Sequence, residues 1–186
     1  MKTNQIFKAF LVFMALFGAL HVSGQRLVDR NGHVGFEASE ALFEPVEAKN
    51  ESVTAVLDIA SNEIASLALM KGFRFQNSLM EEHFNENYME SETYPKATFK
   101  GQLLDFDIAK VTQTPQQVRV DGTLELHGKE KAVDTYLNVG KEGDAIVISG
   151  SFSVTPDDFD ISIPSIVKNK IAKEVNVSLE FKLKEL

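Results

Sequence analysis

Residues 175–184 read VNVSLEFKLK, and this stretch decides the fold class. Apolar residues from Val175 to Leu183 alternate strictly with polar residues from Asn176 to Lys184. Successive side chains of a β-strand point to opposite faces of its sheet. The stretch is therefore predicted to be a strand with one face in a core and the other in water.

Seven segments upstream show similar β-compatible patterns, at 34–38, 53–59, 64–75, 97–103, 118–126, 131–139 and 145–154. Most of them are joined by short turns, without helices between them, which is typical of an antiparallel meander. Such a sheet removes its unpaired edges best by closing into a barrel. We therefore expect an all-β fold, an antiparallel eight-stranded barrel.

One segment between the strands has helical spacing. Ser78 and Glu81 match the capping-box pattern S-x-x-E. Apolar side chains then recur every four residues, at Met80, Phe84 and Tyr88. The pattern predicts an amphipathic helix over 78–91, ending before Tyr94-Pro95, as an insertion that could lie across a barrel opening.

A second, shorter helix is predicted for 165–173. Ile166, Val167 and Ile171 lie at helical spacing, and Pro164 precedes them. Proline is common just before or at the first turn of a helix, which favours this interpretation.

The N-terminal 24 residues have the pattern of a secretory signal peptide. Lys2 and Lys8 make a basic start, residues 9–20 are all apolar, and Val22-Ser23-Gly24 offers small residues for cleavage. The apolar run is short for a membrane span. We expect cleavage near Gly24, a single domain over 25–186, and a periplasmic or secreted protein. An uncleaved N-terminal anchor is the alternative.

Composition excludes several classes of function. The 186 residues contain no cysteine, which excludes a disulfide framework, a thiol nucleophile, an iron–sulfur site and a zinc finger. The net charge is −8, and it becomes −10 without the two lysines of residues 1–24. An acidic protein is a poor nucleic-acid binder, because phosphate contacts need a basic face. The same charge disfavours adhesion to anionic membranes, and we expect no stable membrane insertion.

Candidate catalytic residues are scarce. The histidines beyond residue 24 are His33, His83 and His127. His127 precedes Gly128 in a turn signal and is interpreted as a turn residue, exposed or bonded to the backbone. His83 with Glu86 could supply half of a metal site, but no second histidine cluster completes it. No nucleotide-binding or nucleophile motif occurs, so we expect no cofactor and no metal.

The barrel interior is the place where a ligand could be held. An eight-stranded barrel is either just filled by side chains or just able to hold one small ligand. Five phenylalanines lie on strand-like segments, at Phe36, Phe73, Phe75, Phe99 and Phe152. Glycines, which mark bends or let a ligand approach closely, interrupt strands at Gly35, Gly101, Gly122 and Gly150. The pattern alone leaves a filled core and a ligand cavity equally open.

Four short motifs in order resemble the landmarks of the YceI-like family, also called polyisoprenoid-binding or lipid-binding YceI-like proteins. They are His83-Phe84, Tyr94–Gly101, Gly122–Gly128 and Asp158–Ile161. The resemblance covers about residues 33–186. It implies a lipocalin-like barrel with a helical insertion and an apolar channel for a long isoprenoid or similar lipid chain. It also implies an exported bacterial protein, dimeric in several members, and it carries no catalytic residues.

The resulting hypothesis is an exported, non-enzymatic protein that carries or sequesters a lipid or isoprenoid chain, with a homodimer left open. One alternative is a ligand-free structural or stress protein. Another is an enzyme acting on a small apolar substrate in the same cavity, using His33, His83 or Asp158. The candidate apolar lining residues are Phe36, Phe73, Phe75, Met80, Phe84, Tyr88, Phe99, Leu124, Leu126, Phe152, Phe159 and Ile161.

Overall fold

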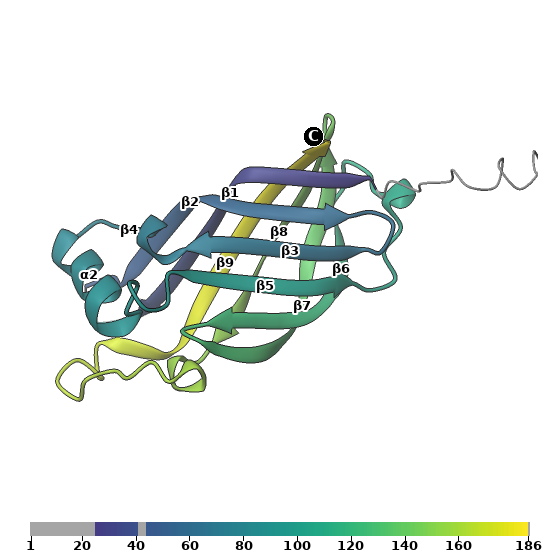
Figure 1. Cartoon of the computed structure of the whole chain (residues 1–186). Coiled ribbons are helices and arrows are strands. Elements are labelled where there is room, and N and C mark those ends of the chain that lie inside the picture. The colour runs from purple at the N-terminus through teal and green to yellow at the C-terminus, as the bar shows by residue number, and fades with distance from the viewer. Residues whose placement is uncertain (1–24, 41–43, 186) are drawn as a thin grey trace, which may run out of the picture.

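The computed structural model describes residues 25–40 and 44–185 (Figure 1). The predicted signal peptide, residues 1–24, lies outside the described residues. The strands are β1 (Arg26–Ser39), β2 (Glu47–Asp58), β3 (Glu63–Leu69), β4 (Arg74–Phe75), β5 (Lys96–Leu103), β6 (Gln116–Leu126), β7 (Lys129–Glu142), β8 (Ala145–Val154) and β9 (Ile171–Glu185).

Eight of these strands close into an antiparallel barrel. The hydrogen-bonded order is β1-β9-β8-β7-β6-β5-β3-β2, and β2 pairs back onto β1. The two-residue strand β4 adds to the other side of β2, where Phe75 faces Ala48. Closure leaves the long strands without free edges, as expected from the chain of short turns. The predicted all-β, eight-stranded antiparallel barrel is confirmed.

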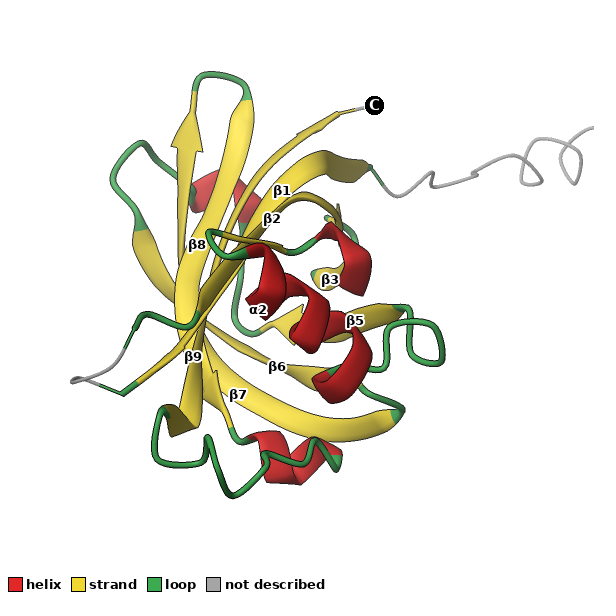
Figure 2. Cartoon of the chain, turned by 90° about the vertical axis from the view of Figure 1, so that its left-hand side faces the viewer, coloured by secondary structure: helices red, strands yellow, loops and turns green. Residues whose placement is uncertain are grey.

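The two halves of the barrel are packed differently. Side chains that are almost fully buried include Leu57, Leu103, Ile148 and Leu183. All four lie toward the same end, which also holds the β7–β8 hairpin at Gly143. This end, called here the filled end, has a close-packed core. The opposite end, called the mouth, carries the helical insertion (Figure 2).

The insertion is a helix of two parts, α2 (Ser78–His83) followed by η2 (Phe84–Tyr88). The N-cap is Asn77, whose side-chain oxygen accepts from the backbone nitrogens of Leu79 and Met80 at 2.9 and 3.4 Å. The capping box predicted for Ser78 and Glu81 is therefore wrong. Asparagine caps a helix as well as serine does, and here it stands one position earlier.

In η2 the helix widens and stops. The Met89 nitrogen donates to the Phe84 oxygen, five residues back, at 2.8 Å, which is the bond of a π-helix. The helix therefore ends at Tyr88, three residues before the predicted limit of 91. Within the described residues, no helix is long and apolar enough to cross a membrane.

The helix predicted for 165–173 does not form. Residues 165–170 make turns closed by bonds from Val167 to Pro164 and from Lys170 to Val167, and Ile171 already begins β9. Short helices owe their stability to an apolar face that packs against the core. Ile166, which would belong to that face, is 84% exposed. The described residues also form three short 3-10 turns, η1 (Met70–Gly72), η3 (Ile108–Lys110) and η4 (Pro156–Phe159).

Candidate ligand-binding cavity

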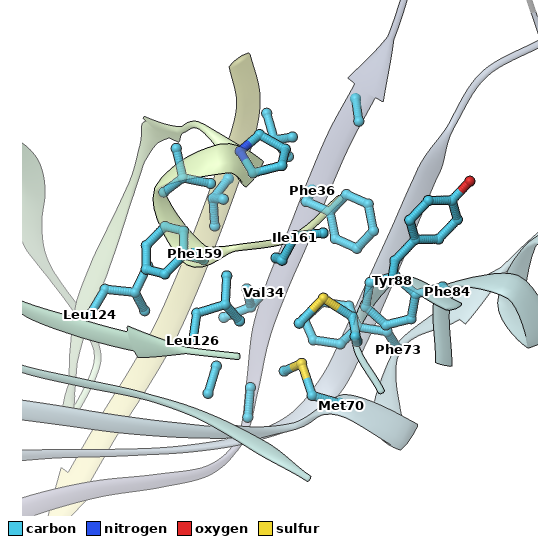
Figure 3. Close-up of a pocket in the computed structure, with 18 of the residues that line it drawn as sticks. Val34, Phe36, Met70, Phe73, Phe84, Tyr88, Leu124, Leu126, Phe159 and Ile161 are labelled. Carbon is cyan, nitrogen blue, oxygen red and sulfur yellow. The ribbon is translucent and has the colours of Figure 1, made fainter. Parts of the chain in front are cut away.

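The mouth half of the barrel is hollow. A cavity of about 470 Å³ lies between the strands, the helix α2–η2 and the turn η4 (Figure 3). Its floor is the top of the filled core, at residues such as Val53, Val120 and Phe181. Its walls are the inward faces of the strands, which the period-two pattern makes apolar. The barrel is thus neither wholly filled nor wholly open.

Every candidate lining residue faces this cavity. They come from β1, β4 and the segment before it, α2, η2, β5, β6, β8, η4 and the residues after η4. The twelve are Phe36, Phe73, Phe75, Met80, Phe84, Tyr88, Phe99, Leu124, Leu126, Phe152, Phe159 and Ile161. Their position around the cavity is a geometric finding, and their contact with a ligand stays a prediction.

Some lining residues were not among the sequence-based candidates. They include Val133 and Leu137 on β7 and Val177 and Leu179 on β9. Their signal was present, because each belongs to the apolar face of an alternating strand. The sequence-based candidates are mainly aromatic residues and residues in or near the family motifs, so they do not include these aliphatic residues of β7 and β9.

Four phenylalanines fasten the helix to the barrel at one side of the cavity. The Phe84 ring stacks on Phe36 of β1 at 5.4 Å between centroids, and it lies 5.2 Å from Phe75 and 5.8 Å from Phe73. Aromatic pairs at these distances add to the free energy of burial. This aromatic cluster, Phe36, Phe73, Phe75 and Phe84, joins β1, β4 and η2 into one wall.

Polar bonds outside the cavity hold the same helix. The Glu81 carboxylate accepts from the Phe75 nitrogen at 3.1 Å and from the Arg74 guanidinium at 2.9 Å. Asn85 donates to the Glu81 carbonyl and accepts from the hydroxyl of buried Ser91, both at 2.8 Å. The helix is thereby tied to β4 before it and to the loop after it.

The turn η4 forms the facing wall and is held by the start of β7. Phe159 is only 1% exposed and points into the cavity. The ring of His127, in the β6–β7 turn, is hydrogen-bonded to the backbone carbonyl of Phe159. Lys129 pairs with Asp160 at 2.7 Å, and Lys131 pairs with Asp158 at 3.3 Å. The hydrogen bond from Lys129 holds the pKa of the Asp160 carboxyl below its ordinary value of 3.8.

His127 is a structural residue at this place. Its Nδ1 lies 2.9 Å from the Phe159 oxygen, its Nε2 lies 3.3 Å from a Glu90 carboxylate oxygen, and its ring centroid is 4.3 Å from that of Tyr94. The turn itself has positive φ at His127 and Gly128, as two-residue hairpin turns require. The interpretation of His127 as a backbone-bonded turn residue agrees with these contacts.

Two strand glycines make room for the ring of Phe99. Gly101 and Gly122 face each other across β5 and β6. A Cβ atom on either glycine would lie 2.7 Å from the ring of Phe99. The ring of Phe99 thus occupies the space that a side chain at either glycine would need. Whether strand glycines also let a ligand approach stays a prediction.

The charged side chains of the lining, and its one histidine, lie at the mouth, while the hydroxyls of Ser66, Thr98 and Thr135 lie among the apolar strand residues. Glu44, His83 and Lys170 border the cavity and are exposed to solvent. The other catalytic candidates, His33 and Asp158, do not border it. In the described part of the chain, no three His, Asp or Glu side chains are grouped as metal ligands would be. The arrangement can desolvate an apolar chain and leave a polar head at the mouth.

Comparison with known proteins identifies the domain type. The family model described as the YceI-like domain matches residues 26–183. No curated protein matches the sequence significantly. Three solved structures with low sequence identity to this chain share its fold. At such low identity the likeness establishes the fold and not the function.

A polyisoprenoid binding domain from Saccharophagus degradans, implicated in plant cell wall breakdown, matches with a TM-score of 0.74 at 17% identity, covering 88% of this chain and 99% of the other. BcnA from Burkholderia cenocepacia matches with a TM-score of 0.65 at 18% identity, covering 82% and 94%. A YceI protein from Campylobacter jejuni matches with a TM-score of 0.59 at 18% identity, covering 78% and 90%.

Proposed function

The chain belongs to the YceI-like domain family, and we propose that it binds one long apolar chain, a polyisoprenoid or similar lipid, in the cavity of its barrel. The proposed role is carriage or sequestration rather than catalysis. The predicted signal peptide supports export, and we propose a periplasmic or secreted location. The homodimer that the family resemblance implies stays a prediction.

The observation that carries this proposal is the hollow mouth half with its apolar walls. Water in a largely apolar cavity finds few polar partners, so an apolar chain can displace it at little cost. Transfer of an alkyl chain into it gains about 0.8 kcal/mol for each buried CH₂. With few polar groups in the walls, selectivity would follow the length and shape of the chain rather than hydrogen bonds.

The cavity volume sets the length of chain that can be enclosed. A cavity of about 150 Å³ accommodates benzene, or roughly 25 Å³ for each carbon. On that scale a cavity of about 470 Å³ encloses on the order of 19 carbons. A longer isoprenoid would place its excess length, and its polar head, outside the mouth between Glu44 and Lys170.

The direct experiment is native mass spectrometry and lipid extraction of the protein purified from its own host. A co-purifying apolar chain in repeated preparations supports the proposal. Protein that is empty in every preparation, and that also takes up no fluorescent polyene fatty acid, contradicts it and favours the ligand-free structural protein. Chemical change of an added chain would favour the enzyme.

A cavity-filling variant makes the test specific. In Leu124→Trp the added ring occupies the cavity, so uptake of the fluorescent chain should fall at least tenfold. Leu126→Trp serves if the first variant does not fold. Leu67→Trp is the matched control, because Leu67 faces outward on β3 and is 38% exposed. Equal uptake by the Leu124 and Leu67 variants, both folded, would show that the chain binds elsewhere.

A further inference from the structure

The loop between η4 and β9, residues 162–170 and called here the portal loop, stands at the mouth of the cavity (Figure 1). Val167 and Lys170 border the cavity, and Ile163 packs against the core. Ile166, in the same loop, does not border the cavity. At 84% it is the most exposed large hydrophobic side chain in the described part of the chain.

The portal loop is also locally basic in an acidic protein. The portal loop holds Lys168 and Lys170, and Lys173 follows at the start of β9. No acidic residue lies between Asp160 and Glu174, whereas the whole chain has a net charge of −8. Of the other ten lysines in the described part of the chain, six form ion pairs, as Lys129 and Lys131 do. None of the three lysines takes part in an ion pair among the described residues.

We propose that the portal loop docks on an anionic lipid surface, so that an apolar chain passes between membrane and cavity without crossing water. An exposed apolar side chain flanked by lysines is the combination that seats a segment in the headgroup region. The loop that would touch the lipid is the same loop that borders the mouth. This inference rests on the proposed function, because it concerns how the bound chain enters.

The rest of the mouth keeps this contact weak and oriented. Glu82 and Glu86 are exposed on α2 and η2, at the same end of the barrel. An anionic surface repels them, so only the portal loop approaches it closely. A carrier that must leave the membrane with its ligand needs such a reversible contact, and a single exposed isoleucine gives a modest one.

The test is co-sedimentation with two kinds of vesicle. The protein is expressed from the full chain in its own host and used in the form that the host produces. One kind is phosphatidylcholine alone, and the other is equimolar phosphatidylcholine and phosphatidylglycerol. The protein should bind the anionic vesicles more tightly, and high salt should weaken this binding. Ile166→Ser should reduce the binding about tenfold or more. Lys168→Gln with Lys173→Gln should reduce it by about fivefold for each lysine.

Matched controls lie away from the mouth. Tyr136→Ser removes a side chain on β7 that is 58% exposed, and Lys141→Gln with Lys184→Gln makes the same change in net charge at the filled end. These controls should bind as the wild type does. Absence of binding to anionic vesicles, equal binding to both kinds of vesicle, or equal loss in variant and control would overturn the proposal.

The outcome is separable from that of the proposed function. Ile166 does not border the cavity, so Ile166→Ser should take up a dissolved fluorescent fatty acid normally in the absence of vesicles. Normal uptake with lost vesicle binding supports the docking role. Normal uptake with unchanged vesicle binding overturns docking and leaves the binding function intact.

Discussion

The Nδ1 atom of His127 lies 2.9 Å from the backbone carbonyl oxygen of Phe159. Because a carbonyl oxygen only accepts hydrogen bonds, Nδ1 carries the proton and donates it. The bond joins the β6–β7 turn to η4, and the Phe159 ring lies in the cavity wall. His127, which does not border the cavity, thus holds in place a residue that does.

His127→Asn should therefore lower the free energy of unfolding by about 1–2 kcal/mol. Asparagine tolerates the positive φ of 50° at this position, so the turn is kept while the bond to Phe159 is lost. Urea denaturation measures the effect. His83→Asn, on the exposed face of α2, should change stability by less than about 0.5 kcal/mol. Equal effects of the two substitutions would show that the His127 bond contributes nothing.

The helix cap gives a second prediction. Asn77→Ala removes the side chain that accepts from Leu79 and Met80, and it should cost about 1 kcal/mol of stability. Ser78→Ala should cost almost nothing, although the sequence pattern makes Ser78 the cap. Thermal denaturation of the two variants compares them directly. A larger loss of stability for Ser78→Ala than for Asn77→Ala would show that Ser78, and not Asn77, caps the helix.

The strand β9 and the segment before it illustrate what the sequence predicts well and what it does not. Alternation predicts the barrel because each long strand has one buried face, as Phe181 and Leu183 are buried while Lys182 is exposed. Helical spacing at 165–173 predicts a helix wrongly. Spacing tells which side chains share a face, but it does not tell whether another surface covers that face, and Ile166 is 84% exposed in the described part of the chain.

The cavity was predictable in part, because the alternation within each strand shows which of its side chains face the barrel interior. The facing of Phe99 or Leu124 follows from the pattern of its own strand. Inward faces are apolar at both ends of the barrel, however, so the pattern cannot tell the filled end from the hollow one. The mouth was unpredictable because Glu44 and Lys170, far apart in sequence, border one cavity only after the barrel has closed.

The close packing around Gly101 gives a third prediction. A Cβ atom there would meet the Phe99 ring at 2.7 Å and also the carbonyl oxygen of Asp121 on the neighbouring strand. Gly101→Ala should destabilise the protein by about 1–3 kcal/mol, because backbone and ring must both move. The control is Gly140→Ala, whose Cβ would lie 3.3 Å from Pro115. Similar urea midpoints for the two variants would contradict the account of the Phe99 ring.

Acid should weaken the attachment of η4. The pKa of Asp160 is lowered in the folded protein, chiefly by its hydrogen bond from Lys129. The stabilisation is complete above the ordinary carboxyl pKa of 3.8 and is lost as the pH falls through the lower folded-state pKa. Asp160→Asn should therefore reduce stability slightly at neutral pH, and this effect should shrink as the pH falls below 3.8. Urea midpoints across this range measure the difference, and a difference that persists in acid would contradict it.

The aromatic cluster yields the last prediction, on the rate of ligand release. Phe84 contacts three other phenylalanines and holds η2 against β1 and β4. Phe84→Leu keeps the wall apolar but loses the ring contacts, so stability should fall by about 2 kcal/mol. A helix attached less firmly should open more often, and a bound fluorescent chain should dissociate several times faster in stopped-flow measurements.

Phe152→Leu is the matched control for this effect. Phe152 lines the cavity on β8, but none of the aromatic pairs in the described part of the chain includes it. The substitution removes similar contact with a bound chain without loosening η2. If release is controlled by the helix, only Phe84→Leu accelerates it. If both variants release the chain equally fast, contact area alone sets the rate and the helix is a fixed wall.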